Sequence, residues 1–193
     1  MNVMNQTKTQ IIETTAALLE RQGYNATGLN QIVAESGAPK GSLYYYFPEG
    51  KEQIGAETLL WSGERMAERI RMGLSMVPDA GEAVYSLAMN IADAIEASHY
   101  QAGGPLTTVA LETAASGERL NLACRDAYGL MRSAFEDKLL ENGYGKDQSA
   151  ELAGYFLAVF EGGILLSRVQ HSGNPLRQAA VHLKSYIESV SRF

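Results

Sequence analysis

The sequence predicts an all-α protein of about nine helices. Apolar residues recur mostly at intervals of three and four, the spacing of one helix face, and the alternation typical of strands is nearly absent. Glycine and proline divide the chain into segments of helical length, most visibly at Gly23, Gly37, Pro48, Pro78 and Pro105. The 193 residues are 46% hydrophobic and contain one cysteine, which fits a folded chain without an internal disulfide.

The first 50 residues predict a helix-turn-helix arrangement. A first helix should start at a capping box over residues 7–10 and end at Gly23, which tolerates a left-handed conformation. Thr27 should cap a second, short helix, and Gly37 should stop it. Two short helices joined by a glycine turn, behind a supporting first helix, place the third helix where it can enter the major groove of DNA. A helical hairpin that serves only as core fits the same pattern.

The third helix, which should start near Pro39, carries the side chains that separate these two interpretations. Leu43, Tyr44 and Phe47 can form a buried face. A core does not need lysine, glycine, serine and tyrosine outside that face, but these residues suit contacts to phosphates and base edges. Groups at the starts of neighbouring helices can add phosphate contacts. The predicted DNA-contact residues are Thr27, Gly28, Lys40, Gly41, Ser42, Tyr44, Tyr45, Tyr46 and Lys51.

Residues 23–54 resemble the DNA-binding head of the TetR family of bacterial transcriptional repressors; they read GYNATGLNQIVAESGAPKGSLYYYFPEGKEQI. Residues 38–42 and the step from Phe47 to Lys51 are similar to the LmrA/YxaF-type subgroup. Tyr46 stands where the family usually has histidine, and Gly104 stands where this subgroup usually has cysteine. The resemblance implies a dimeric repressor that binds a palindromic double-stranded DNA operator, with a body that binds a small effector, often aromatic or drug-like. The matching positions are Gly23-Tyr24, Thr27, Ile32-Val33-Ala34, Gly37, Gly41, Leu43-Tyr44, Phe47 and Lys51.

The charge of the chain constrains how DNA could be bound. The net charge is −6, which by itself argues against a nucleic-acid partner. Residues 1–51 contain four basic and four acidic side chains, so this part is neutral rather than basic. We therefore expect a few focused phosphate contacts per head and a shallow dependence of affinity on salt, with a dimer supplying the rest.

The chain after residue 50 predicts a larger helical body. Helices are expected over residues 51–76, around residues 84–95, after Pro105, and over residues 120–140, 150–169 and 176–190. The expected division is a helix-turn-helix DNA-binding domain over residues 1–50 and an effector-binding and dimerisation domain over residues 51–193.

The end of the body predicts a homodimer through a four-helix interface. Residues 152–166 read LAGYFLAVFEGGILL and are apolar on nearly every side, so this helix should be buried all round, partly by a second chain. The last helix has one apolar stripe and resembles the second dimer helix of the family. The predicted interface residues are Gly162, Gly163, Leu166, Val169, Leu183, Ile187 and Val190.

Methionine and aromatic residues at helical spacing give the body a candidate effector site. Each of them alone suits core packing, but together they could line an adaptable apolar pocket. A Gly103-Gly104-Pro105 turn could form the mobile edge of that pocket. The predicted ligand-contact residues are Met66, Met89, Leu106, Val109, Tyr128, Met131, Phe135, Tyr155, Phe156 and Phe160.

Patterns typical of catalysis or metal binding are absent from the sequence. His99, His171 and His182 lack paired-ligand spacing, Cys124 suits helix packing, and no glycine-rich phosphate loop occurs. We expect no enzyme activity, no cofactor, no metal and no membrane partner, and a cytoplasmic location. The alternative function is a helical homodimer that binds a ligand or a protein without binding DNA.

Overall fold

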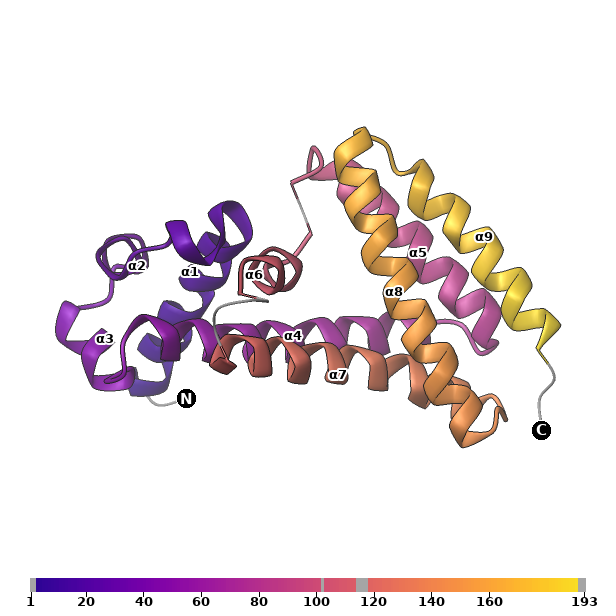
Figure 1. The fold of residues 1–193 in the computed structure, drawn as a ribbon, viewed down its shortest axis with the longest axis horizontal. Coiled ribbons are helices and arrows are strands. Elements are labelled where there is room, and N and C mark those ends of the chain that lie inside the picture. The colour runs from indigo at the N-terminus through magenta and orange to yellow at the C-terminus, as the bar shows by residue number, and fades with distance from the viewer. Residues whose placement is uncertain (1–2, 102, 114–117, 191–193) are drawn as a thin grey trace. The chain divides into compact units, whose positions relative to one another are not determined.

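A computed structural model describes residues 3–101, 103–113 and 118–190. In these ranges the chain forms nine helices and no strand, which confirms the all-α prediction (Figure 1). The helices are α1 (Val3–Ala26), α2 (Leu29–Ser36), α3 (Lys40–Tyr46), α4 (Lys51–Ser75), α5 (Ala80–Ala97), α6 (Pro105–Thr113), α7 (Glu118–Glu141), α8 (Lys146–Gln170) and α9 (Asn174–Ser189).

The chain folds into two compact units. Unit 1 comprises residues 1–64 and 104–128, and unit 2 comprises residues 65–103 and 129–193. Helices α4 and α7 therefore contribute their first halves to unit 1 and their second halves to unit 2. By packing, α6 belongs with the helix-turn-helix, because it lies along α1. The functional division expected at residue 50 stays a prediction.

The core of the helix-turn-helix joins α1, α2, α3 and the start of α4. Burying one Leu, Ile or Phe side chain contributes about 1.5–3 kcal/mol, so a cluster of this size can hold helices as short as α2 and α3 in place. Leu29, Val33, Tyr46 and Trp61 pack against its edge. The buried members are Ile11, Ile12, Leu18, Ile32, Ala38, Leu43, Phe47 and Ile54.

Glycine ends α2 as the sequence predicts, but Gly23 only interrupts α1, which continues to Ala26 beyond the predicted end. Gly37 caps α2 in the left-handed region at φ 64°, and Gly23 interrupts α1 at φ 78°. The predicted starts are wrong. Thr7 lies inside α1, which already begins at Val3, and Gly28 rather than Thr27 is the N-cap residue of α2.

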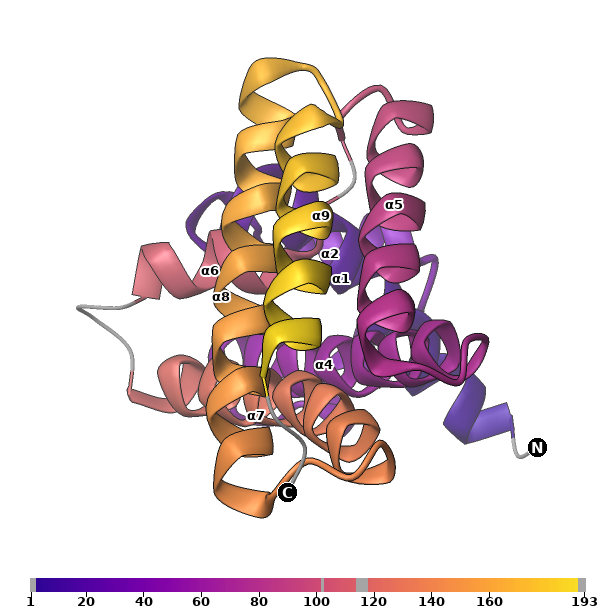
Figure 2. The ribbon, with the colours of Figure 1, turned by 90° about the vertical axis from the view of Figure 1, so that its right-hand side faces the viewer.

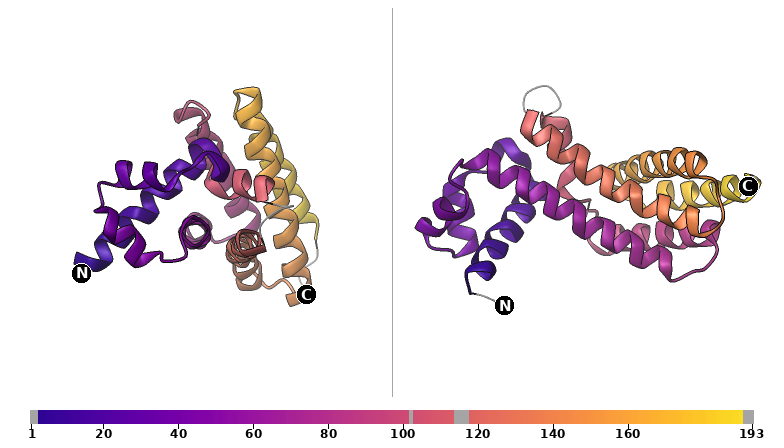
Figure 3. Two further views of the ribbon diagram at one scale, coloured as in Figure 1. Left: turned by 60° about the vertical axis from the view of Figure 1, so that its left-hand side comes forward. Right: turned by 90° about the horizontal axis from the view of Figure 1, so that it is seen from below.

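Helices α4 and α7 run parallel and side by side (Figure 3). In unit 1, a Cβ on Gly63 would lie 2.5 Å from the Cβ of Ala127, and one on Gly55 would lie 3.0 Å from a side-chain carbon of Leu120. In unit 2, the Arg71 guanidinium pairs with Asp137 at 3.7 Å. Small residues thus allow the two backbones to approach closely in unit 1.

Unit 2 is built around α5, α8 and α9, which lie side by side (Figure 2). Gly163 allows α8 to approach α9, because a Cβ at this position would lie 2.7 Å from Leu176. A pair of ion pairs fixes α9 to α5: Arg177 bonds to Glu96 at 2.7 Å and to Asp93 at 2.6 Å. The backbone N–H of Gly173 also donates to Glu96, and these bonds lower the pKa of that carboxyl to about 2, with the Arg177 bond the largest cause.

Candidate nucleic-acid interface

Helix α3 presents a buried and an exposed face over only seven residues. Leu43 and Phe47 are fully buried and anchor the helix to the core. Tyr45 is 68% exposed and Tyr44 is 47% exposed, which is unusual for large aromatic side chains in a folded head. Lys40 and Gly41 are exposed at the start of the same helix. The exposed face of α3 therefore carries a cation, a glycine and two phenols.

The prediction that Tyr44 faces inward is wrong. A helix turns by about 100° per residue, so Phe47 and Tyr46 lie within about 60° of Leu43, whereas Tyr44 lies about 100° away. Tyr46 accordingly packs against the core and is half-buried, as is Ser42. Among the predicted DNA contacts on α3, the structure leaves Lys40, Gly41, Tyr44 and Tyr45 exposed.

Two predicted phosphate contacts have other roles. The Thr27 side chain is buried and its hydroxyl donates to the Gly23 carbonyl at 2.6 Å, so this hydroxyl is not presented to a partner. Lys51 donates from Nζ to the Asn25 carbonyl at 3.3 Å and lies 4.4 Å from the centre of the Tyr24 ring. In the structure these two side chains thus bond to the backbone of the segment before α2.

Several charged side chains of the helix-turn-helix form ion pairs, one with α2, one with α4 and one with α7. Lys8 pairs with Glu57 at 2.7 Å, and Arg21 pairs with Glu35 at 3.1 Å. Bonds from Gln31 and then Arg21 lower the pKa of the Glu35 carboxyl. Within the described part of residues 3–51, Lys40 is the cation for which the structure gives no bonding partner.

Two exposed glycines at this surface are not required by the fold. A Cβ on Gly28 or on Gly41 would meet no described atom within 4 Å, and neither residue has a positive φ. Their lack of a side chain therefore leaves room for another molecule to approach the backbone at the start of α2 and on α3.

A second exposed surface, on α8 and α9 of unit 2, is apolar. Along α8 the exposed residues follow one helical stripe that includes Leu166 at 49% and Val169 at 70% exposure. The Tyr155 ring contacts the Tyr186 ring of α9 at 5.5 Å, which joins the two helices into one face. We call this surface the outer α8–α9 face. Its large apolar members are Tyr155, Leu165, Leu166, Val169 and Tyr186.

The predicted dimer residues divide between this face and the core. Gly162, Leu166 and Val169 are exposed, and Val190 is partly exposed. Gly163, Leu183 and Ile187 are buried inside unit 2, where Gly163 meets Leu176 and the Ile187 carbonyl accepts a bond from the Tyr144 hydroxyl. In this chain these three residues pack in its own core, and their assignment to the interface stays a prediction. That a second chain covers the exposed stripe of α8 also stays a prediction.

Two ranges of the chain match known protein families. Residues 11–58 match the family described as bacterial regulatory proteins, tetR family, and residues 80–182 match the family described as transcriptional regulator LmrA/YxaF-like, C-terminal domain. The chain is 35% identical to the uncharacterized regulator YxaF of Bacillus subtilis over 91% of this chain and 92% of that protein. The chain belongs to the TetR family. It is a helix-turn-helix transcriptional regulator.

Another relative by sequence and two solved structures are also similar to this TetR-family chain. The transcriptional regulator LmrA of Bacillus subtilis is 35% identical, with 94% of both chains covered. A TetR transcriptional regulator from Chloroflexus aurantiacus has a similar solved structure, with a TM-score of 0.80, 24% identity and full coverage of both chains. The reduced form of NemR from E. coli gives a TM-score of 0.79 at 20% identity and covers 93% of this chain and 96% of that one.

The predicted ligand residues fall in both units of this TetR-family chain. In unit 1, Leu106 and Val109 are buried on α6, and the Tyr128 hydroxyl lies 3.2 Å from that of Thr107. In unit 2, the Phe135 ring contacts the rings of Phe156 and Phe160 at 6.1 and 5.3 Å. Met131 is buried, and Met66 and Met89 are partly buried. Tyr155 is the exception, because it lies on the outer α8–α9 face.

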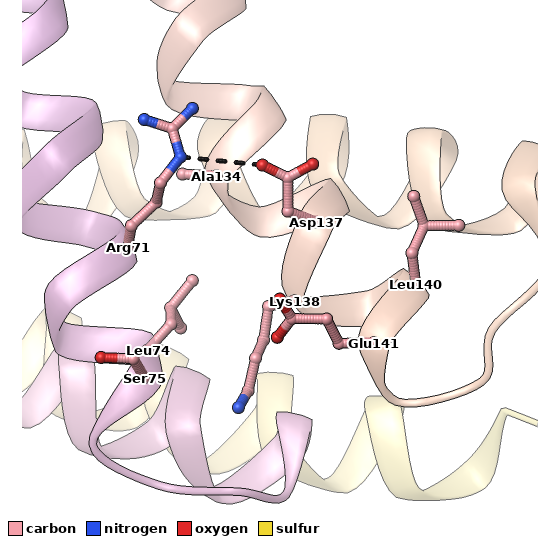
Figure 4. A pocket seen from close by; sticks show the side chains of 8 residues that line it. All are labelled: Arg71, Leu74, Ser75, Ala134, Asp137, Lys138, Leu140 and Glu141. Carbon is pink, nitrogen blue, oxygen red and sulfur yellow. Dashed lines mark ion pairs between the residues drawn. The ribbon is translucent and has the colours of Figure 1, made fainter.

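A pocket of about 430 Å³ lies in unit 2 between the ends of α4 and α7 (Figure 4). None of the predicted ligand residues lines it. Three of its four charged side chains have partners: Arg71 pairs with Asp137, and the buried Lys138 donates to the Val77 carbonyl at 2.6 Å. The fourth, Glu141, is exposed. The pocket therefore does not resemble a site for an apolar effector.

The described residues offer no thiol or metal site. Cys124 is buried, and burial raises the pKa of its thiol to about 11, so the reactive thiolate is scarce at neutral pH. Within the described part of the chain, no three His, Cys, Asp or Glu side chains gather as metal ligands. Helix α8 is the one described helix long and apolar enough to cross a membrane, which by itself is weak evidence, because core helices of soluble proteins pass the same test.

Proposed function

We propose that this TetR-family regulator is a ligand-responsive repressor that binds a palindromic operator as a homodimer and is released by a small effector. The exposed face of α3 carries the proposal, because Lys40, Gly41, Tyr44 and Tyr45 are displayed above a fully buried Leu43 and Phe47 anchor. Such a regulator acts on chromosomal DNA, which places it in the cytoplasm.

DNA binding by each head is expected to rest on few charges. Lys40 is the cation at α3 that can neutralise a phosphate, and the Tyr44 and Tyr45 hydroxyls can bond to phosphates or base edges. Each neutralised phosphate contributes about −0.9 to the slope of log affinity against log salt. One head should bind weakly, and two heads should address half-sites about 34–36 Å apart or a multiple of that distance.

The outer α8–α9 face supports the homodimer. Gly162 lies on the same stripe, and a Cβ there would meet no described atom within 4 Å, so a partner helix could approach closely. A face of leucine, valine and tyrosine side chains in water favours burial against a similar face, and a two-fold dimer supplies one.

Unit 1 contains two hydroxyls that suit an effector contact. Thr58 is fully buried on α4, and the buried Ser62 hydroxyl lies one helical turn further along; among the described residues neither has a hydrogen-bond partner. A buried unsatisfied hydroxyl costs about 1–3 kcal/mol. Because α4 and α7 run parallel with Gly63 against Ala127, Ser62 and Tyr128 project to the same side of the pair, toward Thr107 of α6.

We therefore place a polar end of the effector at Thr58, Ser62 and the Thr107–Tyr128 pair, with Leu106 and Val109 supplying apolar contacts. An effector releases DNA only by binding one conformational state more tightly than the other. A thousandfold release needs about 4 kcal/mol of coupling, more than the usual 1–3 for one pair of sites. Partial release, or a contribution from both protomers, is expected.

The effector site is tested with Thr58→Val, which removes the hydroxyl at nearly constant shape. The variant should melt at the same or a higher temperature, because an unsatisfied group is lost. In a thermal-shift screen of neutral aromatic compounds that carry a hydroxyl or carbonyl, compounds that stabilise the wild type should stabilise the variant less. Destabilisation of the variant by more than about 1 kcal/mol would contradict this placement, because the hydroxyl would then be satisfied without effector.

The DNA-binding function is tested by mobility shift on the region upstream of the protein's own gene. Wild-type protein should retard this DNA, and Lys40→Ala combined with Tyr45→Ala should abolish the shift. Binding that both changes leave intact would show that α3 is not the reader and would favour a helical ligand- or protein-binding dimer instead.

A further inference from the structure

The carboxylate of Glu112 on α6 reaches the segment between α1 and α2. Its Oε2 accepts a hydrogen bond from the backbone N–H of Asn25 at 2.9 Å. Its Oε1 lies against Gly23 so closely that a Cβ on Gly23 would overlap it. All of these residues belong to unit 1.

The backbone at this point needs an acceptor. Gly23 interrupts α1 at φ 78° and ψ 177°, and residues 24–26 then form a new helical turn. The first N–H groups of a helical turn have no acceptor within the turn, and a carboxylate there is favoured both as a cap and by its charge. Glu112 therefore acts as an N-terminal cap supplied by a different helix.

Lys51 holds the opposite side of the same residue. Its Nζ donates to the Asn25 carbonyl, so Glu112 bonds the N–H and Lys51 bonds the C=O of one residue. The two side chains are near enough to interact electrostatically: burial lowers the pKa of Lys51, and the charge of Glu112 acts in the opposite direction.

The capped turn leads directly into the DNA-facing surface. The Thr27 hydroxyl closes the turn on the Gly23 carbonyl, and Gly28, the N-cap of α2, follows at once. The backbone just before α6 is bonded to α1, because the N–H of Gly104 donates to Glu20 of α1 at 2.8 Å. The position of α6 and the position of the start of α2 are thus linked through short polar contacts.

We propose that Glu112 is a positioning residue for DNA recognition, which caps the turn at Asn25 and so fixes the start of α2 against α6. It acts through this turn rather than by touching DNA. The proposal rests on the proposed DNA binding. It implies that a shift of α6 would move the start of α2 through Glu112.

The experiment compares wild type with Glu112→Ala and Glu112→Gln, and uses Glu118→Gln as the control, since Glu118 is exposed in the same unit. Hydrogen–deuterium exchange is followed over residues 24–28, and affinity for a duplex from upstream of the gene is measured by fluorescence anisotropy. Far-UV circular dichroism and melting temperature show that each variant folds.

Glu112→Ala should speed exchange over residues 24–28 and weaken DNA binding about tenfold, which corresponds to the loss of one cap. Glu112→Gln keeps an acceptor but loses the charge, so its effect should be intermediate, and Glu118→Gln should match wild type. Unchanged exchange in Glu112→Ala would overturn the cap.

Faster exchange with unchanged DNA affinity would overturn the positioning role. Failure of the wild type to bind the duplex would instead contradict the proposed function itself, and the positioning role with it. A loss of affinity that tracks only a lowered melting temperature, with equal effects in Ala and Gln variants, would also contradict the role, because it would indicate general destabilisation.

Discussion

The exposed face of α3 and the outer α8–α9 face are both displayed to solvent, yet they differ in every other respect. Helix α3 has seven residues and needs Leu43 and Phe47 in the core to exist at all. Helix α8 has 25 residues and is apolar on most of its surface. The α3 face offers a lysine, a glycine and phenol groups, whereas the α8–α9 face offers aliphatic side chains and tyrosine rings.

The difference indicates what each face can bind. Hydroxyls and one uncommitted cation suit a polyanion whose phosphates and base edges accept and donate hydrogen bonds. Aliphatic side chains suit a surface with the same chemistry, such as the same face of a second chain.

Leu166→Glu should disrupt the dimer most strongly. Two-fold symmetry would place two uncompensated carboxylates in one interface, and an unpaired buried charge costs about 3–5 kcal/mol. We expect a monomer at micromolar concentration by light scattering and the loss of operator binding. Leu111→Glu, at an exposed leucine of α6, should leave the oligomeric state unchanged. Equal behaviour of the two variants would contradict the assignment of the face.

Leu43→Ala should cost about 2–5 kcal/mol of unfolding free energy, because it leaves a cavity in the helix-turn-helix core. Tyr44→Ala should change the unfolding free energy by less than about 0.5 kcal/mol, because Tyr44 is exposed. Chemical denaturation followed by the fluorescence of Trp61, which packs against this core, measures both. A large loss in Tyr44→Ala would show that Tyr44 faces inward after all.

Lys40→Ala and Tyr45→Ala should each weaken operator binding by about 1–3 kcal/mol without lowering the melting temperature. They should differ in salt dependence. Lys40→Ala should reduce the slope by about 0.9 for each head, whereas Tyr45→Ala should leave the slope unchanged. Lys146→Ala, at an exposed lysine of unit 2, is the matched control. A similar loss in the control would indicate a contribution from general charge.

The stability of the α5–α9 packing behind the α8–α9 face should depend on pH more than the stability of α3, which rests on buried apolar side chains. The Glu96 pKa is about 2, below its ordinary value near 4.5, so the stabilisation from its bonds is present above about pH 4.5 and is lost as pH falls toward 2. Glu96→Gln should lower the melting temperature slightly at pH 7 and by clearly less at pH 2.5, where most of the stabilisation is already lost. An equal loss at both values would contradict a charge-based contribution.

Regular spacing made most of the fold predictable from sequence. Periodicity and glycine placement account for the buried pair Leu43 and Phe47, the stop at Gly37 and the nine helices of the described residues. Capping was less predictable, because Thr7 and Thr27 have the right chemistry for caps but neighbouring residues were able to extend α1 and to start α2. Nearby helical positions are also hard to separate. The sequence predicts that Tyr44 faces inward and Tyr46 outward, but Tyr44 is exposed and Tyr46 packs against the core.

The sequence pattern of helix α8 does not show which of its sides packs against its own core. Gly162 and Gly163 are adjacent in sequence, yet Gly162 is exposed and Gly163 packs on Leu176. A helix that is apolar all round has no polar stripe to show which side meets its own core. The roles of Lys51 and Glu112 were equally out of reach, because they depend on contacts between residues 26 and 87 positions apart.

Hydroxyl-radical footprinting on the DNA upstream of the gene tests whether the two α3 helices of one dimer read a palindromic operator. We predict two protected patches of equal size, centred about 10–10.5 base pairs apart or a multiple of that spacing, and both lost in the Lys40→Ala, Tyr45→Ala variant. A single patch, uniform protection, or a footprint that survives both substitutions would contradict the claim.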